Sequence, residues 1–191
     1  GTGGVESDCR SVETDVWNQA RSKYYGKMKK NSRTKSAEGS DFYATPEPIG
    51  LFMVMLARLR AGQSFLEPST GTGSIAAWCP HNVNLTCVEN SYELFERLQL
   101  LINRRATFKH MSFENFYYGR GFDATVMNPP FGTGGKLAAE HLKKACELTR
   151  GTGRVVALIP DTENMDKRVE KMLRELEKDK CYMRMIGSYS L

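Results

Sequence analysis

Four consecutive residues, Asn128-Pro129-Pro130-Phe131, have the types and the order needed to hold an aromatic amine for chemistry. They follow the apolar run 122–127, which is typical of a buried strand. The prolines lack backbone donors and keep the preceding residues extended, so the segment is a stiff strand end with outward-facing carbonyls. An exocyclic amine could donate to the Asn128 side-chain oxygen and the Pro129 carbonyl, while Phe131 stacks on its ring. We therefore take these four residues as the candidate catalytic set; an ordinary proline-rich loop is the alternative.

A second segment combines a short strand, a glycine-rich turn and the expected start of a helix. Gly71 and Gly73 let the backbone turn tightly and approach a ligand that a side chain would exclude. Glu89 ends the next apolar strand and could hold the hydroxyls of a ribose. This spacing alone fits a dinucleotide site equally well. Glu67-Pro68 before the glycines and the later Asn-Pro-Pro-Phe segment argue against a nicotinamide cofactor.

Together these motifs resemble those of class I S-adenosylmethionine-dependent methyltransferases of the Asn-Pro-Pro-Phe amino-methylating type, and they are most similar to adenine-specific (N6) DNA methylases. The resemblance covers roughly residues 41–190. It implies a three-layer Rossmann-like α/β fold, S-adenosylmethionine as cofactor, and direct methyl transfer to the N6 amine of a flipped-out adenine in DNA. Adenine methylation in RNA, N5 methylation of protein glutamine, and a non-catalytic subunit that binds nucleic acid or a partner remain alternatives.

The resemblance also implies which residues bind the cofactor. Phe42 and Tyr43 would contact it, whereas Thr45 and Pro46 would face its methionine end. The family usually has an acidic residue where this chain has Ser112, which can hydrogen-bond only without charge assistance. The full implied set is Phe42, Tyr43, Thr45, Pro46, Glu67, Pro68, Ser69, Gly71, Gly73, Glu89, Ser112, Phe113 and Asn128.

Alternating strand-like and helix-like segments predict a mostly parallel sheet with helices on both faces. Thr45 is the expected N-cap of a helix that runs to Gly62, and Asn90 with Glu93 forms an expected capping box. Further expected elements are a helix over residues 136–148 with His141 in its core face, a strand over 153–160, a helix over 165–176 and a sixth strand over 181–186. The final antiparallel strand of the family fold is expected to be missing or truncated.

The 191 residues suit one domain with a sizeable core, expected over residues 41–191 after a partly disordered basic extension over residues 1–40. The five cysteines are scattered without zinc-site spacing, so we expect no metal and a reducing, cytoplasmic location. No apolar stretch approaches the roughly 20 residues of a membrane span, which predicts no membrane partner.

Residues 21–35 carry seven cations and no acid, although the whole chain has a net charge of only +5. With Tyr24 and Tyr25 among them, these cations could track a phosphate backbone and stack bases. A disordered arm without a dedicated role is the alternative. The candidate nucleic-acid-binding residues are Arg21, Lys23, Lys27, Lys29, Lys30, Arg33 and Lys35. Because we find no candidate element for reading a base sequence, we expect either a separate specificity domain or chain as a partner, or methylation with little sequence preference.

Overall fold

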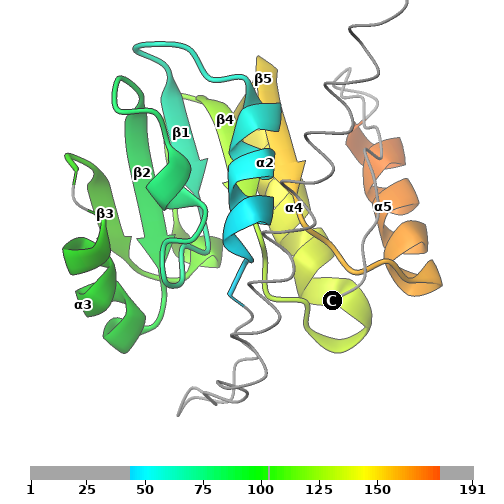
Figure 1. Cartoon of the computed structure of the whole chain (residues 1–191). Coiled ribbons are helices and arrows are strands. Elements are labelled where there is room, and N and C mark those ends of the chain that lie inside the picture. The colour runs from blue at the N-terminus through cyan, green and yellow to red at the C-terminus, as the bar shows by residue number, and fades with distance from the viewer. Residues whose placement is uncertain (1–43, 103, 177–191) are drawn as a thin grey trace, which may run out of the picture.

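In the part of the chain that the computed structural model describes, residues 44–102 and 104–176, five parallel strands form one sheet (Figure 1). The strands are β1 (Ser64–Glu67), β2 (Asn84–Glu89), β3 (Thr107–His110), β4 (Phe122–Met127) and β5 (Thr149–Ala157). Their order in the sheet is β3-β2-β1-β4-β5. The order reverses between β1 and β4, and open α/β sheets bind ligands at the carboxyl ends of strands beside such a reversal.

Several sequence predictions concern residues outside this described part. They are the basic extension over residues 1–40, the cofactor contacts Phe42 and Tyr43, and the sixth strand over residues 181–186. The expectation about the final antiparallel strand also falls there. All of these stay predictions from the sequence.

Helices cover both faces of the sheet, so the predicted three-layer fold is confirmed. The helices are α2 (Glu47–Ala57), α3 (Tyr92–Leu101), α4 (Lys136–Leu148) and α5 (Glu163–Leu176), with short 3-10 turns η1 (Ala76–Trp78), η2 (Phe113–Asn115) and η3 (Thr133–Gly135). Helix α2 lies against one face of β4 and β5, and α4 lies against the other (Figure 1). Among the described helices, none is both long and apolar enough to cross a membrane.

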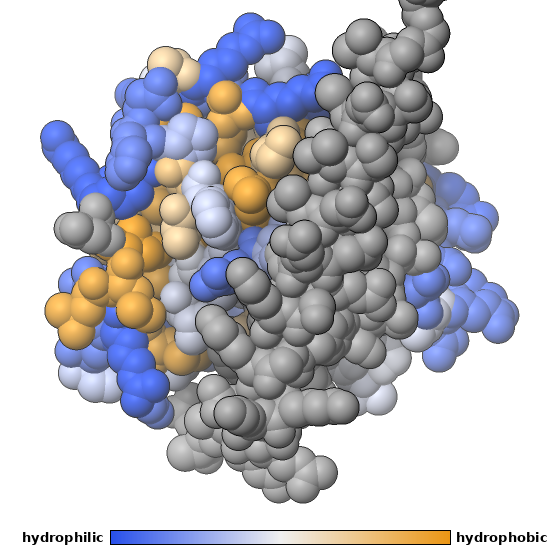
Figure 2. All heavy atoms as spheres, viewed as in Figure 1, coloured by the Kyte–Doolittle hydropathy of each residue, from blue (hydrophilic) through white to orange (hydrophobic). Residues whose placement is uncertain are grey.

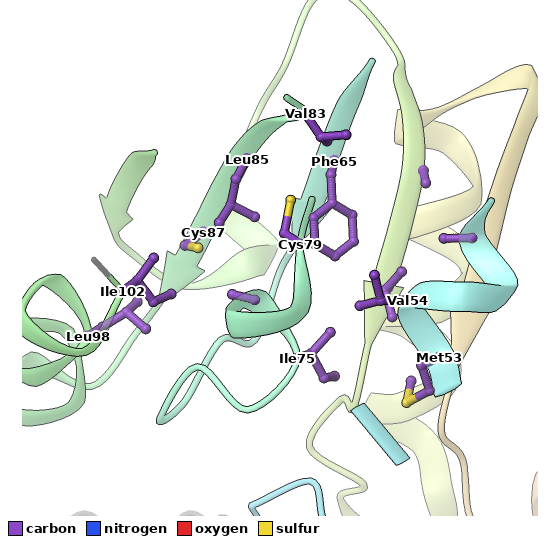
Figure 3. Close-up of a cluster of buried hydrophobic side chains, with 14 of the residues drawn as sticks. Met53, Val54, Phe65, Ile75, Cys79, Val83, Leu85, Cys87, Leu98 and Ile102 are labelled. Atoms are coloured by element: carbon purple, nitrogen blue, oxygen red, sulfur yellow. The ribbon is translucent and has the colours of Figure 1, made fainter. Parts of the chain in front are cut away.

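The core has one layer on each face of the sheet because neighbouring strand residues point to opposite sides. Phe65 of β1 joins the layer formed with α2, η1 and α3, where Val54 and Leu98 also lie (Figure 3). Leu66, the next residue, joins the opposite layer with Met127 of β4. Strands that are apolar on both sides in this way are expected of a parallel sheet buried on both faces.

The first two expected helix caps are wrong. Helix α2 begins at Glu47 after Pro46, and Thr45 makes no capping bond because its hydroxyl contacts another part of the chain. The N-cap of α3 is Ser91, whose side chain accepts from the Leu94 backbone at 3.5 Å. Asn90 is therefore not the cap, and the neighbouring Glu93 instead pairs with a cation one turn along the helix.

The helix expected after the glycine turn is only the three-residue turn η1. Cys79 ends it in an extended conformation, which Pro80 imposes on the residue before it. The following segment is held by Arg104 instead of by a helix. Its guanidinium donates to the carbonyls of Cys79, Pro80 and Val83 at 2.6, 2.7 and 2.6 Å.

Candidate active site

Glu89, at the end of β2, fastens the glycine turn to the sheet. Its Oε2 accepts from the Gly71 backbone at 2.7 Å, and its Oε1 accepts from the Ser91 backbone at 2.7 Å. The side chain is only 8% exposed. A carboxylate has about four acceptor positions, so two remain for the hydroxyls of a ribose. The structure thus brings two residues of the predicted cofactor set, Glu89 and Gly71, into direct contact.

Thr70 anchors the same turn and was not among the residues predicted from the sequence. Its backbone N–H donates to the Val88 carbonyl at 3.0 Å, and its hydroxyl lies 3.0 Å from the carbonyl of Glu67 and 3.1 Å from that of Val88. Gly73 packs against α3, because a Cβ added to it would lie only 3.1 Å from the Leu98 side chain. The φ of Gly73 is +82°, a backbone conformation that favours glycine. The turn is therefore held rigidly between β1, β2 and α3.

Glu67, at the end of β1, is a buried carboxyl beneath this turn. Burial raises its pKa well above the usual range; a hydrogen bond from the Ala76 backbone lowers it, and the nearby Glu89 charge raises it again. The buried environment thus favours the neutral, protonated form of Glu67 over its carboxylate. Its Oε2 has no hydrogen-bond partner among the described residues.

Asn128 follows β4 and contacts the segment that precedes α2. Its side-chain Nδ2 donates to the hydroxyl of Thr45 at 3.1 Å, and Thr45 is only 7% exposed. Asn128 and Phe131 are half-buried, whereas Pro129 between them is buried. The contact joins two predicted site segments that lie 83 residues apart in the sequence. The amide of Asn128 is therefore held by the segment that we expect to face the methionine end of the cofactor.

The chain after Phe131 packs closely on α5. Gly135 has a φ of +73°, and an added Cβ would lie 2.8 Å from the sulfur of Met165. The Gly134 carbonyl accepts from Nε of Arg168 at 2.8 Å. Sequence analysis missed this contact, although the glycines directly after the Asn-Pro-Pro-Phe segment were a signal that the backbone there is tightly confined.

The other predicted cofactor residues differ in exposure. Pro46 and Pro68 are buried, and Ser69 and Ser112 are half-buried. Phe113 is 2% exposed, which places its ring in the core instead of at an open surface. The ring lies edge-on to His141, whose Nε2 is 2.9 Å from Oε1 of Glu114. The expectation that His141 is a core residue is confirmed, since it is 4% exposed.

No three His, Cys, Asp or Glu side chains within residues 44–102 and 104–176 gather closely enough to hold a metal ion. The cysteines in this part of the chain that are buried, Cys79 and Cys87, lie in the core. Burial raises the pKa of the Cys79 thiol to about 11, partly offset by the nearby Arg104 charge.

Comparison with known proteins supports the fold independently. No protein-family model and no curated protein matches the chain. A proposed RNA methyltransferase from Pyrococcus horikoshii matches with a TM-score of 0.62 and 21% identity, over 76% of this chain and 76% of that one. A proposed class I S-adenosylmethionine-dependent methyltransferase from Listeria monocytogenes matches with a TM-score of 0.61 and 15% identity, over 75% of this chain and 54% of that one. The methyltransferase subunit of a type I restriction-modification system from Streptococcus thermophilus matches with a TM-score of 0.58 and 16% identity, over 71% of this chain and 39% of that one.

The described residues therefore have the class I methyltransferase fold. The chain spans about half the length of the Listeria protein and less than half of the Streptococcus subunit.

Proposed function

We propose that this chain binds S-adenosylmethionine and methylates the N6 amine of adenine in nucleic acid, with DNA as the substrate. The observation that carries the proposal is the contact between Asn128 and Thr45 at the carboxyl end of β4. It sets the candidate acceptor of the amine beside the segment expected to face the methyl donor. Two structures of similar fold are described as a proposed RNA methyltransferase, in Pyrococcus, and as the methyltransferase subunit of a type I restriction-modification system, in Streptococcus; both descriptions support a nucleic-acid substrate.

The residues around the glycine turn fit the cofactor. The fixed carboxylate of Glu89 retains acceptor positions for two vicinal hydroxyls, and Gly71, whose backbone that carboxylate holds, has no side chain to exclude a ligand. The orphaned Oε2 of Glu67 marks a polar position beneath the turn that described residues leave unsatisfied. When bound, S-adenosylmethionine supplies an electrophilic methyl group on a sulfonium sulfur.

The residues of the Asn-Pro-Pro-Phe segment would orient the amine. Adenine's N6 amine is a weak nucleophile because its lone pair is delocalised into the ring. If the Asn128 oxygen and the Pro129 carbonyl accept its two hydrogens, the nitrogen becomes more pyramidal and its lone pair turns away from the ring. Such acceptors act mainly by orientation and by stronger hydrogen bonds in the transition state.

Phe131 would replace the stacking that the base loses on leaving the duplex. The basic residues 21–35 are proposed to add non-specific affinity for the phosphate backbone, and a separate domain or chain is proposed to supply sequence specificity. Both of these roles rest on the sequence alone.

The proposal is tested in two steps with the full chain. Calorimetry with S-adenosylmethionine and with S-adenosylhomocysteine measures cofactor binding. Transfer of a tritiated methyl group to pools of DNA, RNA and protein then identifies the substrate, and digestion of labelled DNA to nucleosides identifies the modified base. We expect binding of both cofactor forms and label in N6-methyl-2′-deoxyadenosine from DNA. Label only in RNA or only in protein would replace the DNA assignment by one of the alternatives, and absence of cofactor binding would refute the enzyme assignment.

A further inference from the structure

We infer that a basic stripe on α5, made of Asn164, Lys167, Arg168 and Lys171, binds the phosphodiester backbone of the nucleic acid next to the target base. This inference rests on the proposed function and adds a contact surface to it. Lys167, Arg168 and Lys171 follow Asn164 by three, four and seven positions, so the four residues share one face of the helix. They line an open hollow of about 280 Å³.

The stripe adjoins the candidate catalytic segment. Nε of Arg168 donates to the Gly134 carbonyl at 2.8 Å, and Gly134 lies only three residues after Phe131. The close packing of Gly135 on Met165 fixes α5 against the same loop. When a base of a nucleic acid reaches Asn128, the phosphates on either side of that base should therefore lie near α5.

Apart from the bond between Arg168 and Gly134, α5 packs on the rest of the chain through a different face from the stripe. Its buried residues Met172 and Leu176 pack with Leu142 of α4, and Met165 lies against Gly135 of η3. Figure 1 places α5 on the right of the view, and in the same view Figure 2 shows hydrophilic residues at the surface on that side. Polar side chains kept along one exposed face of a helix are free to serve binding.

The charges of the stripe are available to a phosphate. Lys171 and Asn164 are exposed, and the side chain of Lys167 is 67% exposed. Lys167 pairs with Glu163 one turn earlier, but both side chains are exposed and such pairs are weak in water, so a phosphate can displace the partner. Arg168 offers two terminal amino groups beyond the Nε that holds Gly134.

The decisive variant is Lys167→Gln with Lys171→Gln, which leaves the contact between Arg168 and Gly134 intact. Binding of unrelated duplexes and single strands by the full chain is measured over a salt series. We expect the log–log slope to fall by roughly one unit for each cation removed, about two in total. We also expect KM for nucleic acid to rise while kcat for methyl transfer is kept.

A matched control removes the same charge near the amino ends of the strands, opposite the carboxyl ends where the candidate site lies. Arg60, Arg105 and Arg120 are exposed residues in the segments that lead into β1, β3 and β4. Changing any two of them to Gln should leave the slope unchanged within about 0.5 unit. An equal decrease in control and stripe variants would overturn the inference, because it would show only an effect of net charge.

The inference and the proposed function fail in distinguishable ways. If the wild-type chain methylates nucleic acid but the stripe variant keeps its slope and KM, only the inference is overturned. If the wild-type chain labels protein alone and binds no polynucleotide, both are overturned. Loss of slope on RNA instead of DNA supports the stripe, since the two share the phosphodiester chemistry.

Discussion

The side-chain amide of Asn128 and the hydroxyl of Thr45 lie 3.1 Å apart, although 83 residues separate them in the sequence. Thr45 precedes α2 and Asn128 follows β4, so the bond ties together the start of a helix and the end of a strand. A change at one residue should therefore be felt at the other.

Removing the amide of Asn128 should nearly abolish methyl transfer. Loss of one preorganised hydrogen-bonding group at a reaction centre typically costs ~10²-fold or more in rate. For Asn128→Ala we expect that loss in single-turnover transfer, with cofactor affinity by calorimetry close to wild type. Asn82→Ala, in an exposed loop before β2, is the control and should retain full activity. Equal rates for wild type and Asn128→Ala would exclude the proposed mechanism.

Thr45→Val should slow methyl transfer through Asn128. The variant keeps the side-chain volume but removes the oxygen that accepts from Nδ2, so the amide loses its fixed orientation. We expect kcat to fall by roughly tenfold, which corresponds to about 1.4 kcal/mol, with KM for nucleic acid little changed. Thr45→Ser, which retains the hydroxyl, should restore most of the rate. In a double-mutant cycle with Asn128→Ala the two effects should not add, and additive effects would show that the contact is unimportant.

Glu89→Ala should weaken cofactor binding. The carboxylate both holds the Gly71 backbone and is proposed to accept from the ribose, and hydrogen bonds to a charged group contribute about 1.5–3 kcal/mol. We expect a dissociation constant higher by roughly 10- to 100-fold in calorimetry. Glu96→Ala, an exposed change on α3, is the control. Unchanged affinity in a folded Glu89→Ala protein would remove Glu89 from the cofactor site.

Glu67 should make folding stability depend on pH. Because burial raises its pKa in the folded state, the folded protein binds a proton that the unfolded chain releases above about pH 4.5. Its contribution to stability is therefore greatest below that pH and decreases as pH rises toward the folded-state pKa. Glu67→Gln removes this proton linkage, so the difference in unfolding free energy between variant and wild type should grow in favour of the variant from pH 5 to pH 8. Urea unfolding across that range measures it, and a constant difference would contradict the buried, protonated state.

Arg104→Met should loosen the segment between η1 and β2. The Arg104 guanidinium donates hydrogen bonds to carbonyls of this segment, and methionine cannot replace them. Each such charge-assisted bond contributes about 1.5–3 kcal/mol when counted alone. We expect a loss of roughly 2–3 kcal/mol in unfolding free energy, and faster labelling of the buried Cys79 by a thiol reagent under native conditions. Arg105→Met, at the exposed neighbouring position, should change neither. Equally slow labelling of Cys79 in both variants would mean that the Arg104 bonds are not needed to keep this segment closed.

The sequence predicted the regular elements well where an apolar pattern was long and uninterrupted. The predicted strand over residues 122–127 and the helix over residues 136–148 are confirmed with the same bounds, because their core faces are set by local periodicity. The strand expected over residues 153–160 instead begins at Thr149 and carries an irregularity opposite β4. Its glycines and polar residues concealed that early start.

The errors and omissions concern contacts between distant residues. Thr45 has the right type for a helix cap, but a tertiary bond to Asn128 uses its hydroxyl instead. The hydrogen bonds of Arg104 to the carbonyls of Cys79, Pro80, His81 and Val83 likewise join segments that no local pattern connects. The same is true of the packing of Gly135 on Met165. For the candidate site, the sequence thus supplied the residue types, while the pairings among them required the fold.

The brevity of η1 has an electrostatic consequence for ligand selection. In a dinucleotide site, a long helix after the glycine turn presents roughly half a positive charge to the pyrophosphate. A turn of three residues provides little of that field. Polyphosphate nucleotides such as ATP or NAD should therefore be poor competitors here, whereas a sulfonium compound carrying its own positive charge meets no such penalty. A motif whose spacing fits dinucleotides would then discriminate against them by charge.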